Sequence, residues 1–83
     1  MPTLDRVPPT PAAGQVIRDH RRLTGTYQGE FARQLGYSRA YLNNIEKGRR
    51  GITPEMVAKL ATRFGVKPAD LHAELTSSTV RAA

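Results

Sequence analysis

The sequence predicts an all-α fold, a compact bundle of five short helices. Apolar residues recur at helical spacing in five successive segments, and no segment keeps the two-residue alternation of a half-buried strand. Glycine or proline stands at the ends of these segments. The 83 residues have room for one small domain. We expect residues 14–75 to form it, between a disordered proline-rich arm (1–13) and a flexible tail (76–83).

The first two predicted helices cover residues 14–24 and 27–35. The first ends before Gly25, and the second ends at Gly36, since glycine takes a positive φ at little cost. Tyr27 cannot cap the second helix, so Thr26 is the candidate cap, one residue early. The inward positions of the two helices are Val16, Ile17, His20 and Leu23, then Phe31, Ala32 and Leu35.

The third predicted helix covers residues 39–47 and begins after Ser38, a good N-cap. Gly48 follows its last residue. Only Gly36 and Tyr37 separate the second helix from this cap, so the two helices must cross at a steep angle instead of lying antiparallel. This is helix-turn-helix geometry.

The fourth and fifth predicted helices complete the bundle. The fourth has Thr53 as its cap and ends at Gly65. The fifth covers residues 68–75 and buries Leu71 and Leu75. The apolar stripe of the fourth helix consists of Met56, Val57, Leu60, Ala61 and Phe64.

Basic residues are concentrated in the first half of the predicted domain. The chain has a net charge of +6 and a sequence pI of about 10.5. Residues 18–50 include eight basic and three acidic residues, whereas residues 51–75 include three of each. We therefore expect a polyanionic partner, and double-stranded DNA before RNA, because few aromatic side chains are present for bases to stack on.

The composition argues against several other classes of protein. Without cysteine, and with two distant histidines outside any carboxylate cluster, we expect no metal site and no cofactor. No spacing builds a nucleophile, a base and an orienting group, so we expect no enzyme. No apolar run approaches the roughly 20 residues that span a bilayer, so we expect no membrane partner. The expected location is the cytoplasm, with DNA binding placing the protein at the nucleoid.

The outward face of the third predicted helix suits the edges of DNA bases. At about 100° per residue, Leu42 and Ile45 face inward. Arginine can bond guanine bidentately and asparagine can bond adenine, each worth roughly 1–3 kcal/mol of discrimination. Tyr41 lies at the border of the two faces, where core packing is favoured over a phosphate contact. The outward residues are Arg39, Ala40, Asn43, Asn44 and Lys47.

The segment from Gln28 to Gly48 resembles the Cro/cI-type helix-turn-helix of phage repressors, the XRE family. The likeness extends from Ile17 to Leu71, and it implies a lambda-repressor-like five-helix bundle that binds operator DNA as a homodimer. His20, where the family usually has leucine, departs from the pattern, as do Thr26 and Tyr27 before Gln28. The matching residues are Gln28, Ala32, Gly36, Leu42, Ile45 and the run Glu46, Lys47, Gly48, Arg49 and Arg50.

The resemblance implies three sets of DNA-binding residues and one structural ion pair. A role for Gln28 in capping alone is the competing interpretation at that position. The ion pair joins the first and third helices through Arg21 and Glu46. The sets are Arg39, Ala40 and Asn44 at bases; Gln28, Ser38 and Asn43 at phosphates or neighbouring bases; and Lys47, Arg49 and Arg50 along the backbone.

The sequence thus predicts a sequence-specific transcription regulator, a repressor that reads the major groove with residues 39–47 as a homodimer on a palindromic operator. The candidate dimer interface is the fifth helix with Leu71, Leu75 and Val80, unless the two leucines only close the core. The alternative is an antitoxin-like or other protein-interaction module, whose arm or tail binds a protein partner while the helices bind its own promoter.

Overall fold

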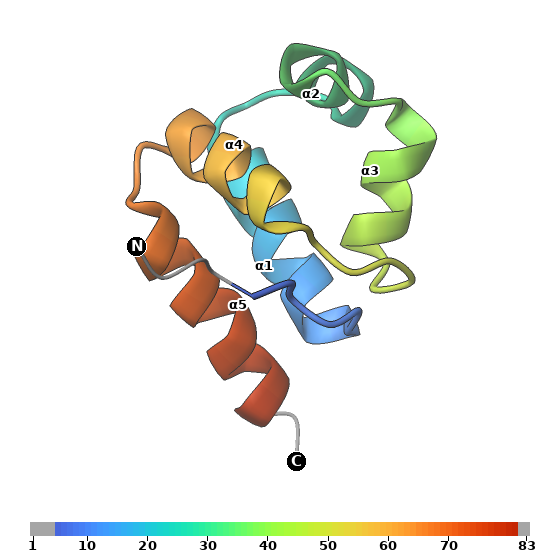
Figure 1. Cartoon of the computed structure of the whole chain (residues 1–83). Helices are drawn as coiled ribbons and strands as arrows, with labels where there is room; N and C mark the ends of the chain where they lie inside the picture. Colours follow the sequence, from blue (N-terminus) through green and yellow to red (C-terminus); the bar gives the residue numbers. More distant parts are fainter. Residues whose placement is uncertain (1–4, 82–83) are drawn as a thin grey trace.

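The computed structural model describes the backbone of residues 5–81 and the side chains of residues 5–77. Five helices follow one another along this part of the chain, as predicted (Figure 1). They are α1 (Pro11–Leu23), α2 (Gln28–Leu35), α3 (Arg39–Glu46), α4 (Pro54–Phe64) and α5 (Pro68–Arg81).

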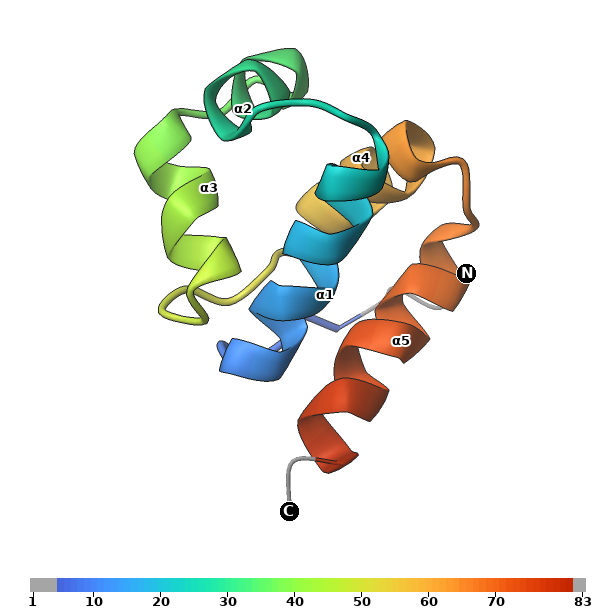
Figure 2. The ribbon, with the colours of Figure 1, turned by 180° about the vertical axis from the view of Figure 1, so that it is seen from behind.

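Helix α1 lies at the centre of the bundle. It packs against α5 on one side and α3 on the other, while α2 contacts α3 and α4 contacts α5 (Figure 2). The Cα radius of gyration of 11.6 Å fits a single small domain. In this arrangement α2 and α3 stand together at one side of the molecule, and the other three helices support them.

The first described residues are ordered parts of the fold, so the prediction of a disordered arm over residues 1–13 is wrong from residue 5 onward. Val7 is fully buried, and its backbone exchanges two hydrogen bonds of 2.9 Å with Ile52. Thr10 caps α1, which starts at Pro11 and not at Gly14, by accepting a hydrogen bond from the Ala13 N–H at 3.0 Å. Residues 1–4 lie outside the described part of the chain.

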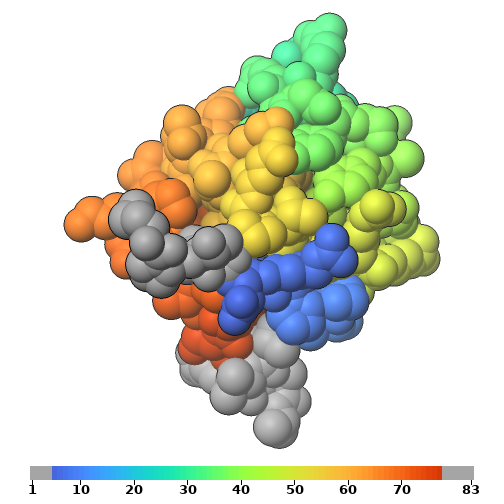
Figure 3. Space-filling view, in the orientation of Figure 1, coloured from blue at the N-terminus to red at the C-terminus, as the bar shows by residue number. Residues whose placement is uncertain are grey.

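This N-terminal segment, residues 5–10, lies beside the loop that joins α3 to α4 (Figure 3). Proline disfavours regular structure here, but one apolar side chain and one pair of backbone bonds fix the segment. The segment is therefore available to hold the α3–α4 loop in place.

Helix α5 continues six residues beyond its predicted end at Leu75. No glycine or proline follows Leu75. The hydroxyl of Thr76 donates a hydrogen bond to the His72 carbonyl oxygen at 2.9 Å, within the helix. Residues 76–81 are thus helical where a flexible tail was predicted, and residues 82 and 83 lie outside the described part.

The core draws on all five helices, on the N-terminal segment through Val7 and on the α3–α4 loop through Ile52. Leu71 and Leu75 are 1% and 0% exposed, so the prediction that they form a dimer interface is wrong: these side chains close the core. The side chain of Val80 lies outside the described part. Leu23, predicted to face inward, is 85% exposed at the end of α1. The buried apolar residues are Val7, Ala13, Ile17, Phe31, Ala32, Leu35, Leu42, Ile45, Ile52, Met56, Val57, Leu60, Ala61, Leu71 and Leu75.

The crossing of α1 over the end of α3 is unusually close and depends on Gly14. A Cβ atom at this position would lie 2.3 Å from the carbonyl oxygen of Glu46. Gly48, which follows α3, has a φ of +76° and packs against the backbone of Thr10 and Pro11. The absence of side chains at these two glycines lets the start of α1 hold the end of α3.

Candidate nucleic-acid interface

The turn between α2 and α3 is built from local signals. Gly36 ends α2 with a φ of +85°, and its N–H and that of Tyr37 donate to carbonyl oxygens in the last turn of α2. Ser38 starts α3 by accepting a hydrogen bond from the Tyr41 N–H at 3.1 Å. The two helices therefore meet through a short turn, as the sequence predicts.

The start of α2 differs from its prediction. Tyr27 occupies the N-cap position without a side-chain cap and is 87% exposed, so α2 begins at Gln28. Thr26 does not cap the helix: its hydroxyl donates to the Thr24 carbonyl oxygen at 3.4 Å and accepts from Arg63 at 3.1 Å. The entry into α2 is thus fixed by contacts to Thr24, the C-cap of α1, and to Arg63 in α4.

Helix α3 has one buried face and one outward face. Leu42, Ile45 and Glu46 are buried, and Tyr41 is half-buried against the edge of the core, as its packing interpretation requires. The helix ends at Glu46, one residue earlier than predicted, and Lys47 is its C-cap. On the outward side Arg39, Ala40 and Lys47 are exposed, and Asn43 and Asn44 are half-buried.

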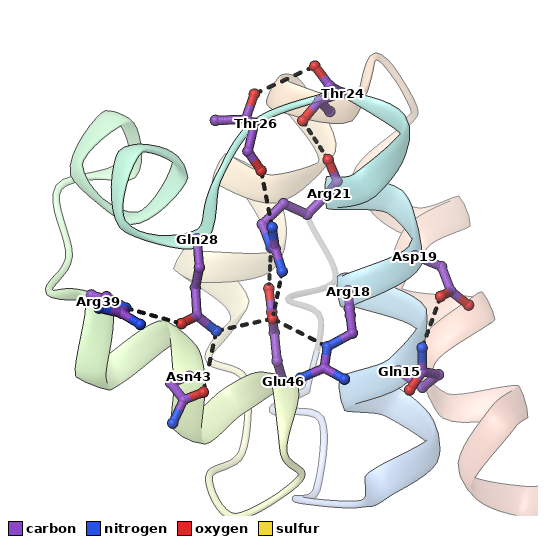
Figure 4. Close-up of polar contacts among 10 residues, drawn as sticks. All are labelled: Gln15, Arg18, Asp19, Arg21, Thr24, Thr26, Gln28, Arg39, Asn43 and Glu46. Atoms are coloured by element: carbon purple, nitrogen blue, oxygen red, sulfur yellow. Dashed lines mark hydrogen bonds and ion pairs between the residues drawn. The ribbon is translucent and has the colours of Figure 1, made fainter.

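A buried carboxylate holds α3 against α1. The Glu46 side chain is 0% exposed and accepts two hydrogen bonds from Arg21, at 2.7 and 3.1 Å (Figure 4). Arg21 also donates to the carbonyl oxygen of Thr26 at 2.9 Å, and Arg18 lies 3.7 Å from the same carboxylate. Two arginines therefore face one carboxylate, which leaves a local excess of positive charge beside α3.

Gln28 joins α2 to this group and to the outward face of α3. Its Nε2 atom donates to the Glu46 carboxylate at 3.1 Å and to the Asn43 amide oxygen at 3.3 Å, and its Oε1 accepts from Arg39 at 3.4 Å (Figure 4). Gln28 therefore does more than start a helix. We call Arg18, Arg21, Gln28, Arg39, Asn43 and Glu46 the Glu46 network.

A groove of about 540 Å³ opens between α1 and the start of α2, next to α3. It brings together Gln28, Arg39 and Asn43, which the sequence suggested, with Arg18 and Arg22, which it did not. Its walls are Arg18, Arg21, Arg22, Tyr27, Gln28, Gly29, Glu30, Arg39 and Asn43, which we call the arginine groove. The spacing of the three α1 arginines, on one helix face, is a signal that could have identified the missing residues.

The loop after α3 carries the remaining predicted contacts. Lys47, Arg49 and Arg50 are all exposed, and the guanidinium of Arg50 lies over the ring of Tyr41. The Arg49 N–H donates to the Asn44 carbonyl oxygen at 2.9 Å, which ties the loop to α3. The structure therefore brings the predicted DNA-binding residues to one side of the molecule, along α3 and both of its flanks.

The two histidines make structural contacts away from this side. His20 is half-buried, stacks on Phe64 at 4.8 Å, and lies 2.8 Å from a carboxylate oxygen of Glu74. His72 bonds to the carbonyl oxygen of Asp5 at 2.8 Å. Within residues 5–77, no three histidine, cysteine or acidic side chains cluster in a way that could bind a metal ion. None of the described helices combines the length and the apolar character needed to cross a membrane.

Two solved structures of regulators are similar to this chain. The restriction-modification controller protein C.AhdI from Aeromonas hydrophila aligns with a TM-score of 0.64 and 32% identity, over 71% of this chain and 86% of that one. The clp gene regulator ClgR from C. glutamicum aligns with a TM-score of 0.68 and 30% identity, over 81% of this chain and 86% of that one.

Sequence comparison likewise finds a regulator and a helix-turn-helix family. The propionyl-CoA carboxylase regulator of Cereibacter sphaeroides is 41% identical over 54 residues, which are 65% of this chain but 12% of that protein's length. The profile of a helix-turn-helix family matches residues 17–71, the region that holds most of α1, all of α2 to α4, and the start of α5. The chain belongs to the XRE-type helix-turn-helix family of DNA-binding transcription regulators.

Proposed function

We propose that this chain recognises a specific double-stranded DNA sequence by placing α3 in the major groove. The observation that carries the proposal is the division of α3 into two faces. Leu42, Ile45 and Glu46 fix the helix to the domain, and the opposite face presents only polar or small side chains. Arg39, Ala40 and Asn44 are proposed to meet base edges, where arginine and asparagine can bond bidentately and alanine can contact the thymine methyl group.

The Glu46 network supports this role because it restrains side chains before DNA arrives. Arg39 and Asn43 are both hydrogen-bonded to Gln28, and Gln28 is bonded to the buried carboxylate. A side chain that is already oriented loses less conformational entropy on binding. Gln28 and Asn43, with Ser38, are proposed to contact phosphates or neighbouring bases, and the network would set their positions.

The flanks of α3 are proposed to contact the DNA backbone. Lys47, Arg49 and Arg50 follow the helix on one flank and are exposed. The arginine groove lies on the other flank and includes Arg18 and Arg22, so we add these two residues to the proposed phosphate contacts. Phosphate contacts fix the register of a protein on DNA, whereas base contacts determine which sequence it prefers.

The proposal includes a homodimer on a palindromic site. The outward face of one short helix can read only a few base pairs, and a two-fold assembly would double the number of contacts, with half-sites about 34 Å apart. Since Leu71 and Leu75 are buried within one chain, the interface must use other residues. Sedimentation velocity over a range of concentrations, with and without DNA, tests this part, and a monomer under every condition would contradict it.

The regulatory outcome is proposed to be repression, by occupation of an operator that polymerase needs. The similar proteins are named as regulators of a restriction-modification system, of clp genes and of propionyl-CoA carboxylase. These names support control of transcription and leave the target of this chain to experiment. Expression of a reporter placed behind the selected site should fall if the protein is a repressor. A rise in expression would contradict repression and indicate activation.

The experiment that tests recognition is selection of bound duplexes from a random library at about 150 mM salt. Arg39→Ala and Asn44→Ala are selected in parallel, with Arg33→Ala as the control because Arg33 is exposed on α2 and pairs with Glu30. We expect a two-fold motif for the unmodified protein and a relaxed preference at particular positions for the two α3 variants. Salt-sensitive binding without any sequence preference would contradict the proposal.

The antitoxin-like alternative is less well supported by the structure. Residues 5–10, part of the arm that the alternative offers to a partner, already pack on their own domain through Val7 and Ile52, and residues 76–81 of the tail continue α5. Copurification of the chain with a protein encoded beside it would favour the alternative.

A further inference from the structure

Two tyrosine rings are stacked between two cations on one flank of α3. The ring centroids of Tyr37 and Tyr41 are 4.8 Å apart, with an interplanar angle of 16°. Lys59 Nζ lies 4.8 Å from the Tyr37 centroid, and the Arg50 guanidinium carbon lies 4.7 Å from the Tyr41 centroid. We call Lys59, Tyr37, Tyr41 and Arg50 the tyrosine ladder. It connects α4, the α2–α3 turn, α3 and the α3–α4 loop.

The Lys59 end of the ladder is anchored by other contacts. Lys59 Nζ donates to the Leu35 carbonyl oxygen at 3.3 Å, in the last turn of α2, and lies 3.4 Å from the Glu55 carboxylate. Tyr37 and Tyr41 are half-buried and pack against the core. This end of the ladder is therefore a fixed platform.

The Arg50 end is open. Arg50 is exposed, and among the side chains of residues 5–77 no carboxylate forms an ion pair with it. The contact that positions its guanidinium is the face of Tyr41, since a cation is attracted to the negative face of an aromatic ring. A guanidinium held over a ring can still offer N–H groups to an anion, and its planar fork matches a phosphate group.

The backbone on either side of Arg50 is also restrained. The Arg49 N–H is bonded to the Asn44 carbonyl oxygen at 2.9 Å, and Ile52 is paired with Val7. A short, tethered loop and a ring contact together restrict the positions that the guanidinium can take. The ladder thus joins a half-buried anchor to one charge without an ion-pair partner among the described side chains, beside the outward face of α3.

We propose that Tyr41 is a positioning residue, supported by Tyr37 and Lys59, that holds the Arg50 guanidinium ready for a phosphate of the DNA backbone. The inference rests on the proposed function, because it assumes that α3 lies against DNA. It adds that affinity for the backbone depends on an aromatic ring that itself makes no phosphate contact. Loss of the ring should therefore weaken binding only while Arg50 is present.

A double-mutant cycle in fluorescence anisotropy tests the inference, with a labelled duplex that carries the selected site and a second duplex of unrelated sequence. The variants are Arg50→Ala, Tyr41→Leu and the double variant, and Tyr41→Phe is the matched control that keeps the ring. We expect Tyr41→Leu to raise Kd about two- to five-fold on both duplexes and Tyr41→Phe to leave it unchanged. In the Arg50→Ala background, Tyr41→Leu should add nothing.

The salt dependence of binding tests the phosphate contact of Arg50, and unfolding measurements test whether each variant is folded. Arg50→Ala should lower the slope of log K against log salt by about 0.9, the value for one phosphate contact. Circular dichroism and thermal unfolding check each variant, and Tyr37→Leu is the second variant should Tyr41→Leu fail to fold. Tyr37→Leu removes the support behind Tyr41 and should weaken binding in the same direction, again only with Arg50 present.

Failure of the proposed function and failure of the tyrosine ladder give different results in these experiments. Equal affinity for both duplexes with a strong Tyr41 effect would overturn the sequence-specific function and leave the ladder standing. Sequence preference with an unchanged Kd for the folded leucine variants, or with equal losses in the presence and absence of Arg50, would overturn the ladder alone. A chain that binds neither duplex would overturn both.

Discussion

The carboxylate of Glu46 is fully buried and accepts two hydrogen bonds from the guanidinium of Arg21, at 2.7 and 3.1 Å. The pair joins the last residue of α3 to α1, and the Arg21 side chain is 12% exposed. Removing one member of such a pair leaves the other charge buried without compensation. The orientation of α3 therefore depends on an ion pair with α1, whose Arg21 also lines the arginine groove.

Glu46→Gln should lower the free energy of unfolding by about 3–5 kcal/mol, the usual cost of breaking a buried ion pair. The amide keeps the shape of the side chain but leaves Arg21 and Arg18 without a carboxylate. Urea unfolding followed by circular dichroism measures the loss. Glu30→Gln is the control, since its ion pair with Arg33 is exposed and should contribute at most about 1 kcal/mol. Equal losses in the two variants would contradict the structural role of Glu46.

Gly14→Ala should destabilise the domain, although alanine is the better helix former. A Cβ at Gly14 would lie 2.3 Å from the Glu46 carbonyl oxygen, so α1 and α3 must separate, at a cost of about 1–3 kcal/mol. Gly29→Ala in α2 is the matched control, because a Cβ there meets only the Arg39 side chain at 3.6 Å. We expect the control to gain up to about 1 kcal/mol. Thermal unfolding of both variants measures the difference, and a stabilised Gly14→Ala would contradict the close crossing.

Val7→Ala tests whether the N-terminal segment is part of the fold. The valine is 0% exposed, so truncation should cost roughly 1–3 kcal/mol through lost burial and an unfilled cavity. Arg6→Ala, at the exposed neighbouring position, should change stability by no more than about 0.5 kcal/mol. Amide exchange at Ile52, whose N–H donates to the Val7 carbonyl oxygen at 2.9 Å, should accelerate in Val7→Ala alone. Unchanged exchange would mean that the pairing does not hold the loop.

Much of the helical framework could be predicted because its signals are local. Ser38 and Thr53 each cap the helix that follows, and Gly36 and Gly65 end helices with a positive φ. These residues act on their immediate neighbours, so the sequence alone places α2, α3 and α4 to within one residue. The core positions Leu42 and Ile45 follow from helical spacing in the same way.

The ends of the chain and the groove could not be predicted because tertiary contacts determine them. Prolines near Val7 favour an irregular arm, but the burial of Val7 and its pairing with Ile52 make the segment part of the core. After Leu75 no residue signals an end to α5, and the lack of apolar periodicity there predicted a tail. In the sequence Arg18 is one of several basic residues, and only the packing of α1 on α3 places it beside Glu46.

Arg18→Ala is the test of the arginine groove as a backbone contact. Arg18 lies 3.7 Å from Glu46 at its Nε atom, its side chain is 33% exposed, and it lines the groove beside Gln28 and Arg39. If the exposed part of the guanidinium meets a phosphate, the variant should lower the slope of log K against log salt by about 0.9 and weaken binding equally on all sequences. Arg33→Ala, which removes the same charge outside the groove, should leave the slope unchanged. A change in base preference for Arg18→Ala would assign it to recognition instead, and equal slopes for the two variants would remove it from the interface.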